Sequence, residues 1–292
     1  MEAGRHLGGL AEREARALDN LWAMDVHKLF AIKPGTKVRL LNFDPGDTGE
    51  FSDKNAAVAA TVENVKKLAE VQLKLFAENK RALLVILQGI DTSGKDGTIR
   101  HCMSGLNPAG VTVTSFKRPT EHELDHDFLW RVHQCVPGKG EIGVFNRSHY
   151  EDVLIGKVRK LAPAAEIEAR YDHINNFEQL LADSGTIVLK FFLYISKDEQ
   201  KKRLSEHLQD PTKNWKFHPG DLEERKLWPD YIKAYEAALS RCSTKNAPWF
   251  VIPSDKKWFR NLAVSQAIVD TVKAMKISMP VSQFDLSTFK VV

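Results

Sequence analysis

The sequence predicts an α/β fold with a mainly parallel sheet that is covered by helices on both faces. Five short apolar runs recur along the chain, at 82–87, 111–116, 142–145, 186–195 and 250–252. Stretches of helical length separate most of them, and strands that alternate with helices form parallel sheets whose two faces are buried. We therefore expect a three-layer sandwich, and the 292 residues fit one elaborated domain.

Local signals place the first helix and the segments around the fourth strand. Apolar residues at helical spacing predict a helix over 53–80, directly before the first strand. The fourth strand ends at Ser196, and Glu199 follows three residues later, which is the pattern of a capping box that opens a helix. Two prolines and a glycine interrupt the helical pattern within 211–220, which predicts a loop between two helices where a lid would lie.

Composition excludes several classes of protein. Apolar residues make up 43% and charged residues 27% of the chain, and no run approaches eighteen apolar residues, so we expect no membrane span. The N-terminus lacks the apolar core of a secretory signal, and the protein is expected in the cytoplasm. Three widely spaced cysteines favour reduced thiols. A net charge of +4 is too small to indicate nucleic acid but is compatible with an anionic substrate.

The segment GIDTSGKDGT, residues 89–98, follows the first strand and predicts a phosphate-binding loop. Gly89, Gly94 and Lys95 satisfy the pattern GxxxxGK. Glycines let backbone N–H groups and a helix N-terminus converge on an oxyanion, and the lysine adds a point charge. The residues expected to bind phosphate or nucleotide in this loop are Gly89, Thr92, Ser93, Gly94, Lys95, Asp96, Gly97 and Thr98.

This loop departs from the usual pattern at one position. Asp96 stands where a Ser or Thr would place its hydroxyl on Mg²⁺. Asp91 lies inside the loop, so the segment carries its own carboxylates to the place where magnesium and phosphate meet. A metal site here need not depend on a hydroxyl ligand.

Polar residues at the ends of the second and third strands belong to the same predicted site. Lys117 and Arg118 follow the second strand, and 146–152 follow the third. Ligands of open parallel sheets bind at the carboxyl ends of the strands, so these residues are expected to share a pocket with the loop. Positive charge with carboxylates among it suits phosphoryl transfer.

Each of these residues also has a structural interpretation. Arg118 and Arg147 are ordinary candidates for surface ion pairs, and only their position after strands favours a role in binding. His149 is expected to be a packing residue. Glu151 and Asp152 suit either the first turn of a helix, where acids favour the dipole, or a metal site.

Four motifs occur in order across 89–236 and resemble those of the family 2 polyphosphate kinases. They are GxDxxGKDG, FKRPT, IGVFNRSHYEDVL and WKFHPGDLEERKLWPDYIKAYE, and KPGTKVRLLNFDP extends the resemblance to about residue 33. The resemblance implies a P-loop kinase-like fold, closest to thymidylate kinase, with a helical lid at about 203–235. It further implies a single domain over 33–280, between an N-terminal extension of 1–32 and a C-terminal tail of 281–292.

The resemblance also implies an activity. Members of this family transfer a phosphoryl group between inorganic polyphosphate and a nucleotide, which here means forming ADP and ATP from AMP and ADP, reversibly. The variant FNRSHYED is similar to the subgroup that phosphorylates both AMP and ADP. The implied cofactor is Mg²⁺, with Mn²⁺ as a substitute, and the implied assembly is a homo-oligomer without nucleic acid or membrane partners.

Roles follow for the residues that match the motifs. Lys95 would hold the phosphates in transit, Asp91 would organise magnesium and orient or deprotonate the acceptor, and Arg147 would neutralise the transferring group. Lys117 and Arg118 would hold the phosphate of the acceptor nucleotide.

Two further positions follow from the resemblance. Arg225 of the lid would move in on closure. Asn146 stands where many relatives have an Asp; it is expected to contact phosphate or nucleotide, while the metal is left to Asp91 with Glu151 and Asp152.

Two rival functions stay open at the level of sequence. An ATP-dependent nucleotide kinase would use the same loop, although Asp96 argues against it. A non-catalytic sensor of nucleotide or polyphosphate is suggested by Asn146 but disfavoured because Asp91, Lys95 and Arg147 are all present.

Overall fold

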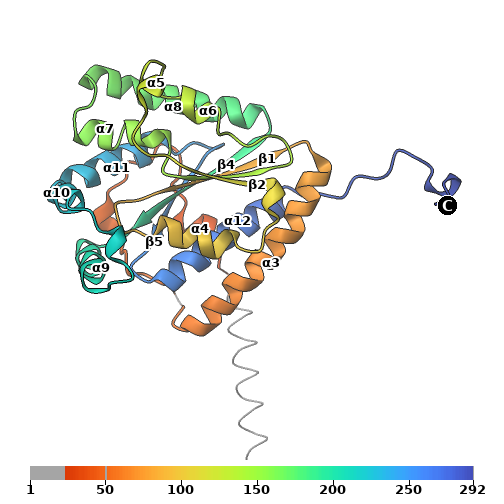
Figure 1. The fold of residues 1–292 in the computed structure, drawn as a ribbon, viewed down its shortest axis with the longest axis horizontal. Coiled ribbons are helices and arrows are strands. Elements are labelled where there is room, and N and C mark those ends of the chain that lie inside the picture. The colour runs from red at the N-terminus through yellow and green to blue at the C-terminus, as the bar shows by residue number, and fades with distance from the viewer. Residues whose placement is uncertain (1–23, 50, 292) are drawn as a thin grey trace, which may run out of the picture.

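Five parallel strands form the centre of the molecule. The computed structural model describes residues 24–49 and 51–291, and within these the strands lie in the order β2-β3-β1-β4-β5 (Figure 1). They are β1 (Ala82–Gln88), β2 (Val111–Ser115), β3 (Ile142–Asn146), β4 (Thr186–Tyr194) and β5 (Trp249–Pro253). All four pairings are parallel, which confirms the predicted sheet. The strand boundaries differ from the predicted runs by one residue at one end, or at both ends for β5.

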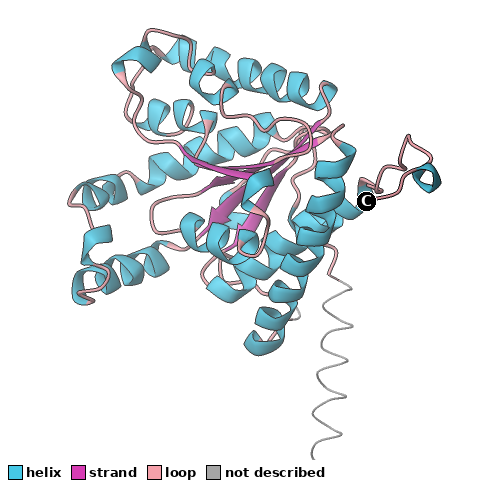
Figure 2. Cartoon of the chain, turned by 45° about the vertical axis from the view of Figure 1, so that its right-hand side comes forward, coloured by secondary structure: helices cyan, strands magenta, loops and turns pink. Residues whose placement is uncertain are grey.

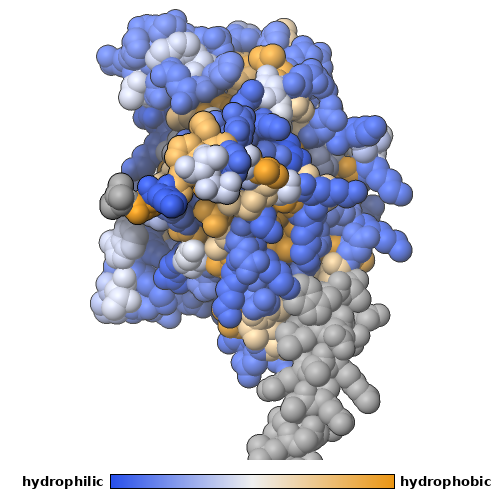
Figure 3. Space-filling model, turned by 90° about the vertical axis from the view of Figure 1, so that its right-hand side faces the viewer, coloured by the Kyte–Doolittle hydropathy of each residue, from blue (hydrophilic) through white to orange (hydrophobic). Residues whose placement is uncertain are grey.

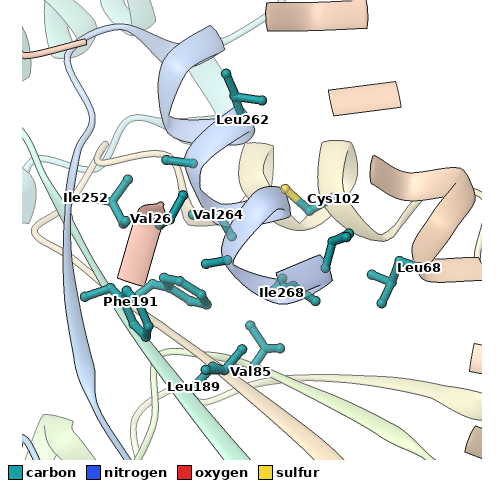
Figure 4. Close-up of a cluster of buried hydrophobic side chains, with 14 of the residues drawn as sticks. Val26, Leu68, Val85, Cys102, Leu189, Phe191, Ile252, Leu262, Val264 and Ile268 are labelled. Atoms are coloured by element: carbon teal, nitrogen blue, oxygen red, sulfur yellow. The ribbon is translucent and has the colours of Figure 1, made fainter. Parts of the chain in front are cut away.

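Alternate residues of each inner strand enter different cores. Leu83, Val85 and Leu87 face one core, whereas Leu84 and Ile86 face the other, so every residue of β1 is buried. The first core is covered by α3 (Lys54–Glu78), α4 (Lys95–Met103) and α12 (Lys257–Ala274), and Figure 4 shows α12 packed there. On the opposite face lie α8 (Ala164–Asp183) and α11 (Trp228–Cys242). Figure 2 shows helices on both sides of the sheet, which is the expected three-layer arrangement.

The predicted helix starts are largely confirmed. Asp53 caps α3 by accepting hydrogen bonds from the backbone N–H groups of Asn55 (2.7 Å) and Ala56 (3.1 Å). Ser196 caps α9 (Lys197–Gln209) by accepting from Glu199 N (3.0 Å). The second half of the expected capping box is absent, because Glu199 pairs with an arginine of its own helix.

The first part of the segment between β4 and β5 lies beyond the carboxyl ends of the strands. Helix α9 leads into the 3-10 turn Asn214–Lys216 and then α10 (Gly220–Lys226), at the left of Figure 1. Side chains over 210–227 are mostly exposed, whereas Arg203, Ala234 and Tyr235, near the ends of the expected lid range, are buried in the body.

A buried ionic cluster joins β4 to the helices of the second face. Lys190 Nζ donates to the Glu178 carboxylate, to Tyr150 Oη (2.8 Å) and to the carbonyl of Cys242 (2.6 Å). His149 Nε2 lies 3.2 Å from Glu178 Oε1, and all four side chains are buried. His149 is thus a packing residue, as expected.

The remaining helices are short. They are α2 (Val26–Phe30), α5 (Glu121–Leu124), α6 (Trp130–His133) and α7 (Ile155–Val158). Met24, Val26 and Phe30 pack into the first core, so this described part of the expected N-terminal extension belongs to the body. Most of that extension, 1–23, lies outside the described residues. The chain after α12 is largely exposed and runs away from the body (Figure 1).

The three cysteines are reduced thiols, as their spacing in the sequence predicts. Cys102, Cys135 and Cys242 are all free, and burial raises the pKa of the Cys102 and Cys242 thiols to about 12. Over residues 24–49 and 51–291, no helix has the length and apolar character needed to cross a membrane.

Candidate active site

The loop between β1 and α4 forms a cradle whose lysine points inward. Gly94 caps α4 with a φ of 102°, a conformation that favours glycine, and Thr92 takes a φ of 66° although it carries a side chain. The buried Lys95 Nζ donates a hydrogen bond to the carbonyl of Gly89 (2.7 Å). The first backbone N–H groups of α4 have no partner within the helix and are available to an anion.

Electrostatics and orphaned hydroxyls both indicate that the cradle accepts a polar ligand. Burial, aided by the charge of Arg147, lowers the pKa of Lys95 to about 8. Within the described part of the chain, Thr92 Oγ1 and Ser93 Oγ are buried without a hydrogen-bond partner. Buried hydroxyls are rarely left unsatisfied, so a ligand or water is expected to complete them.

Arg147 lies between two carboxylates at the end of β3. Its Nη2 donates to Asp91 Oδ1 (2.8 Å) and its Nη1 to Glu151 Oε2 (3.4 Å). The backbone of Arg147 has a φ of 64°, a strained conformation for a residue with a Cβ, and its N–H donates to the carbonyl of Leu87 in β1 (3.0 Å). Burial opposes the charge, but Glu151 and Asp91 outweigh it and raise the pKa of Arg147.

Asn146 connects β3 to the first turn of α4. Its Nδ2 donates to Asp96 Oδ1 at 2.6 Å. A second carboxylate at position 146 would repel Asp96, so the amide suits a loop in which an acid follows the lysine. The structure therefore brings Asp91, Lys95, Asn146, Arg147 and Glu151 together, as the strand-end argument predicts.

Other predicted site residues lie further from the cradle. Lys117 and Arg118 are exposed after the edge strand β2, two strand spacings or about 10 Å from β1. Arg225 Nη1 donates to the carbonyl of Lys197 and to Gln200 Oε1, both at 2.7 Å. Gln200 Nε2 in turn donates to the Asp91 carbonyl (3.2 Å), so α10 is linked to the cradle through α9.

Asp152 points away from the cradle. Its carboxylate accepts a hydrogen bond from Arg170 Nη1 (3.2 Å) and lines a separate hollow of about 730 Å³ beside α5, α6 and α8. Burial raises the pKa of Asp152 to about 6, although Arg170 and Arg131 oppose the shift. This placement gives Asp152 no contact with Asp91 or Lys95 and does not favour its expected role as a metal ligand.

Sequence reasoning missed two buried arginines behind the cradle. Arg203 of α9 donates from Nη1 to the carbonyls of Thr92 (2.8 Å) and Ser93 (3.1 Å). Arg260 of α12 donates from Nη1 to the same Ser93 carbonyl (3.0 Å). Neither lies at a strand end or in the loop motif. The available signal was that both lie in helices that directly follow a strand, Arg203 in the middle of α9 after β4 and Arg260 as the fourth residue of α12 after β5.

Comparison with known proteins identifies the family. The sequence model described as Polyphosphate kinase 2 matches residues 51–280. The chain belongs to the polyphosphate kinase 2 family. The matched residues include the cradle, the end of β3, α9 and α10.

Two curated relatives and one solved structure of this polyphosphate kinase 2 family cover nearly the whole chain. An AMP/ADP-polyphosphate phosphotransferase of Meiothermus ruber is 51% identical over 87% of this chain and 95% of its own. An ADP-polyphosphate phosphotransferase of Rhodopseudomonas palustris is 43% identical over 87% of this chain and 92% of its own. The crystal structure of polyphosphate kinase 2 from Arthrobacter aurescens superposes with a TM-score of 0.87 at 44% identity, covering 91% of this chain and 95% of that one.

Proposed function

We propose that this chain transfers the terminal phosphoryl group of inorganic polyphosphate to AMP and to ADP, forming ADP and ATP in a reversible reaction. The observation that carries the proposal is Arg147, held by Asp91 and Glu151 beside the lysine of a phosphate cradle. The names of the relatives from Meiothermus and Rhodopseudomonas support polyphosphate as the donor and AMP or ADP as the acceptor.

The residues of the site supply positive charge and hold the two substrates in position. The terminal phosphates of the donor occupy the cradle, where Lys95 exchanges the carbonyl of Gly89 for phosphate oxygens. Arg147 stabilises the charge on the group in transit, and Asp91 orients the attacking oxygen of the acceptor phosphate. Phosphoryl transfer needs in-line positioning and charge stabilisation more than covalent chemistry. Lys117, Arg118 and, from the lid, Arg225 bind the acceptor nucleotide in this proposal.

The oxygen donors around Arg147 fit a magnesium ion. Over the described residues, no group of three or more His, Cys, Asp or Glu side chains is arranged to hold a metal. Mg²⁺ is commonly bound by one or two carboxylates together with substrate phosphates, a role that Asp91 and Glu151 suit. When bound there, Mg²⁺, or Mn²⁺ in its place, would neutralise negative charge on the phosphates of the substrates.

The proposal is tested with polyphosphate as the sole donor. Purified protein is incubated with ADP, Mg²⁺ and long-chain polyphosphate in the absence of ATP, and ATP is measured by luminescence. A second reaction contains AMP as the only nucleotide and is sampled over time for ADP and ATP. ATP in the first reaction, and ADP followed by ATP in the second, are expected. No ATP from ADP would contradict the proposal.

The same reactions distinguish the two rival functions. An ATP-dependent nucleotide kinase would phosphorylate AMP with ATP but form no ATP from polyphosphate. A sensor would bind polyphosphate in a calorimeter without any product. Lys95→Ala serves as the control for contaminating kinases, because activity that survives in this variant does not arise at the cradle.

The proposal also covers the location, the domain and the assembly of the protein. We place it in the cytoplasm, where its nucleotides are found, as a single kinase domain over 33–280 against which residues 24–32 pack. A homo-oligomer is supported by apolar side chains at the surface of α3 and of the C-terminal segment (Figure 3). The exposed apolar residues there include Val58, Val62, Leu73, Phe76, Val281, Phe284, Leu286 and Phe289.

A further inference from the structure

The guanidinium of Arg260 lies directly behind the phosphate cradle. Arg260 is the fourth residue of α12 and is only 2% exposed. Its Nη1 donates to the carbonyl of Ser93 (3.0 Å), and a Cβ added to Gly94 would collide with it. A Cβ added to Gly97 would lie 3.2 Å from Nη2, so the guanidinium is packed against the turn and the first residues of α4.

Arg260 differs from the neighbouring Arg203 in its counter-charge. Arg203 Nε donates to Glu199 Oε1 at 2.8 Å, which forms an ion pair. The partners of Arg260 are neutral: the Ser93 carbonyl, and Asn261 Oδ1 at 2.9 Å from Nη2 and 3.2 Å from Nε. Among the described residues, Arg260 makes no salt bridge. Burial and the charge of Arg203 lower its pKa to about 10, so it stays charged near neutral pH.

A buried cation without a carboxylate partner destabilises a folded protein. Arg260 lies beneath an anion-binding loop. A phosphate bound in the cradle would interact with its guanidinium across the loop and so offset the cost of burying the charge. The hydrogen bond from Arg260 also holds the Ser93 carbonyl toward α12.

We propose that Arg260 is a positioning residue of the donor site, which holds the Ser93 carbonyl away from the substrate and supplies positive potential that the terminal phosphates of polyphosphate compensate. The inference rests on the proposed function for the identity of the polyanion. It differs from a packing role, because a packing residue would stabilise the ligand-free protein, whereas this charge is balanced only when phosphate is bound.

The variants Arg260→Met and Arg260→Lys separate charge from packing. In Arg260→Met the Ser93 carbonyl keeps its hydrogen bond from Arg203 (3.1 Å). Tripolyphosphate binding is measured by calorimetry without nucleotide, and melting temperature is measured with and without tripolyphosphate. Arg260→Met is expected to weaken binding about tenfold or more through the loss of one nearby charge. The melting temperature of the ligand-free variant should equal or exceed that of the parent.

Arg260→Lys, which retains the charge, should recover most of the affinity. Lys80→Met is the matched control. It removes one charge near the start of β1, at the end of the sheet opposite the cradle, and should alter neither the tripolyphosphate affinity nor the melting temperature. In steady-state assays Arg260→Met is expected to raise the KM for polyphosphate more than it lowers kcat.

Two results would overturn the inference. One is a tripolyphosphate affinity in Arg260→Met within twofold of the parent. The other is an Arg260→Lys variant that binds no better than Arg260→Met. The binding arm needs no nucleotide and no turnover, so a parent protein that binds tripolyphosphate but makes no ATP would contradict the proposed function and leave the inference about Arg260 standing.

Discussion

The amine of Lys95 is buried against a carbonyl and near the guanidinium of Arg147. Burial lowers its pKa to about 8, against an ordinary value of 10.5. The folded protein therefore holds fewer protons at Lys95 than the unfolded chain between these values, and this residue makes stability rise with pH in that window. Phosphate binding requires the charged amine, so it must be accompanied by proton uptake above pH 8.

We predict that the affinity for tripolyphosphate falls as pH rises through about 8. Calorimetry in buffers of different ionisation enthalpy should detect uptake of up to about one proton per ligand at higher pH. Lys95→Arg keeps its charge throughout and should lose most of this uptake. An unchanged proton count in Lys95→Arg would assign the effect to the ligand or to another group.

The backbone of Arg147 is strained, and its side chain pairs with two carboxylates. A role in positioning the transferring group would explain why the protein keeps this strain. We predict that Arg147→Ala reduces kcat by roughly 10³-fold or more, as for other arginines that stabilise a transferring phosphoryl group. The fold should persist, because the side chain is partly exposed and lies outside both main cores. Activity is measured by ATP formation and folding by circular dichroism. Near-normal turnover would remove Arg147 from the mechanism.

At the scale of elements, the pair Lys190 and Glu178 fastens β4 to α8, and the carbonyl of Cys242 adds α11. Removing one partner leaves the other charge buried, so Lys190→Met should lower the free energy of unfolding by about 3–5 kcal/mol. The double variant Lys190→Met/Glu178→Leu removes both charges and should be less destabilised than the sum of the single changes. Urea denaturation of the four proteins gives the coupling, and simple additivity would count against the pair.

The elements differ in how far the sequence determines them. Continuous apolar runs located β1 and β4 because both faces of these strands are buried. The edge strand β2 is half exposed, yet its end, like those of β1 and β4, was predicted to within one residue. The start of α9 was predicted from Ser196, but the partner of Glu199 was not, since Arg203 competes for that carboxylate through tertiary packing.

At the scale of the whole molecule, the sequence predicted the layers and the half of the site that sits at strand ends. Lys95 was found from the GxxxxGK motif, and Arg147 was found because parallel strands end at one edge. Asp152 was grouped with Glu151 by adjacency, yet the turn at His149–Asp152 points the two side chains to different places. The arginines behind the cradle were not predicted, because their contacts with the Thr92 and Ser93 carbonyls come from the packing of elements that are far apart in the sequence.

The Ser93 carbonyl accepts hydrogen bonds from residues 110 and 167 positions further along the chain. Such distant contacts form late, after the intervening loops have closed. A chain emerging from the ribosome would therefore complete its sheet before α12 could support the cradle. A chain that terminates before residue 260 would carry the whole loop motif and the contact from Arg203, but it would lack the contact from Arg260.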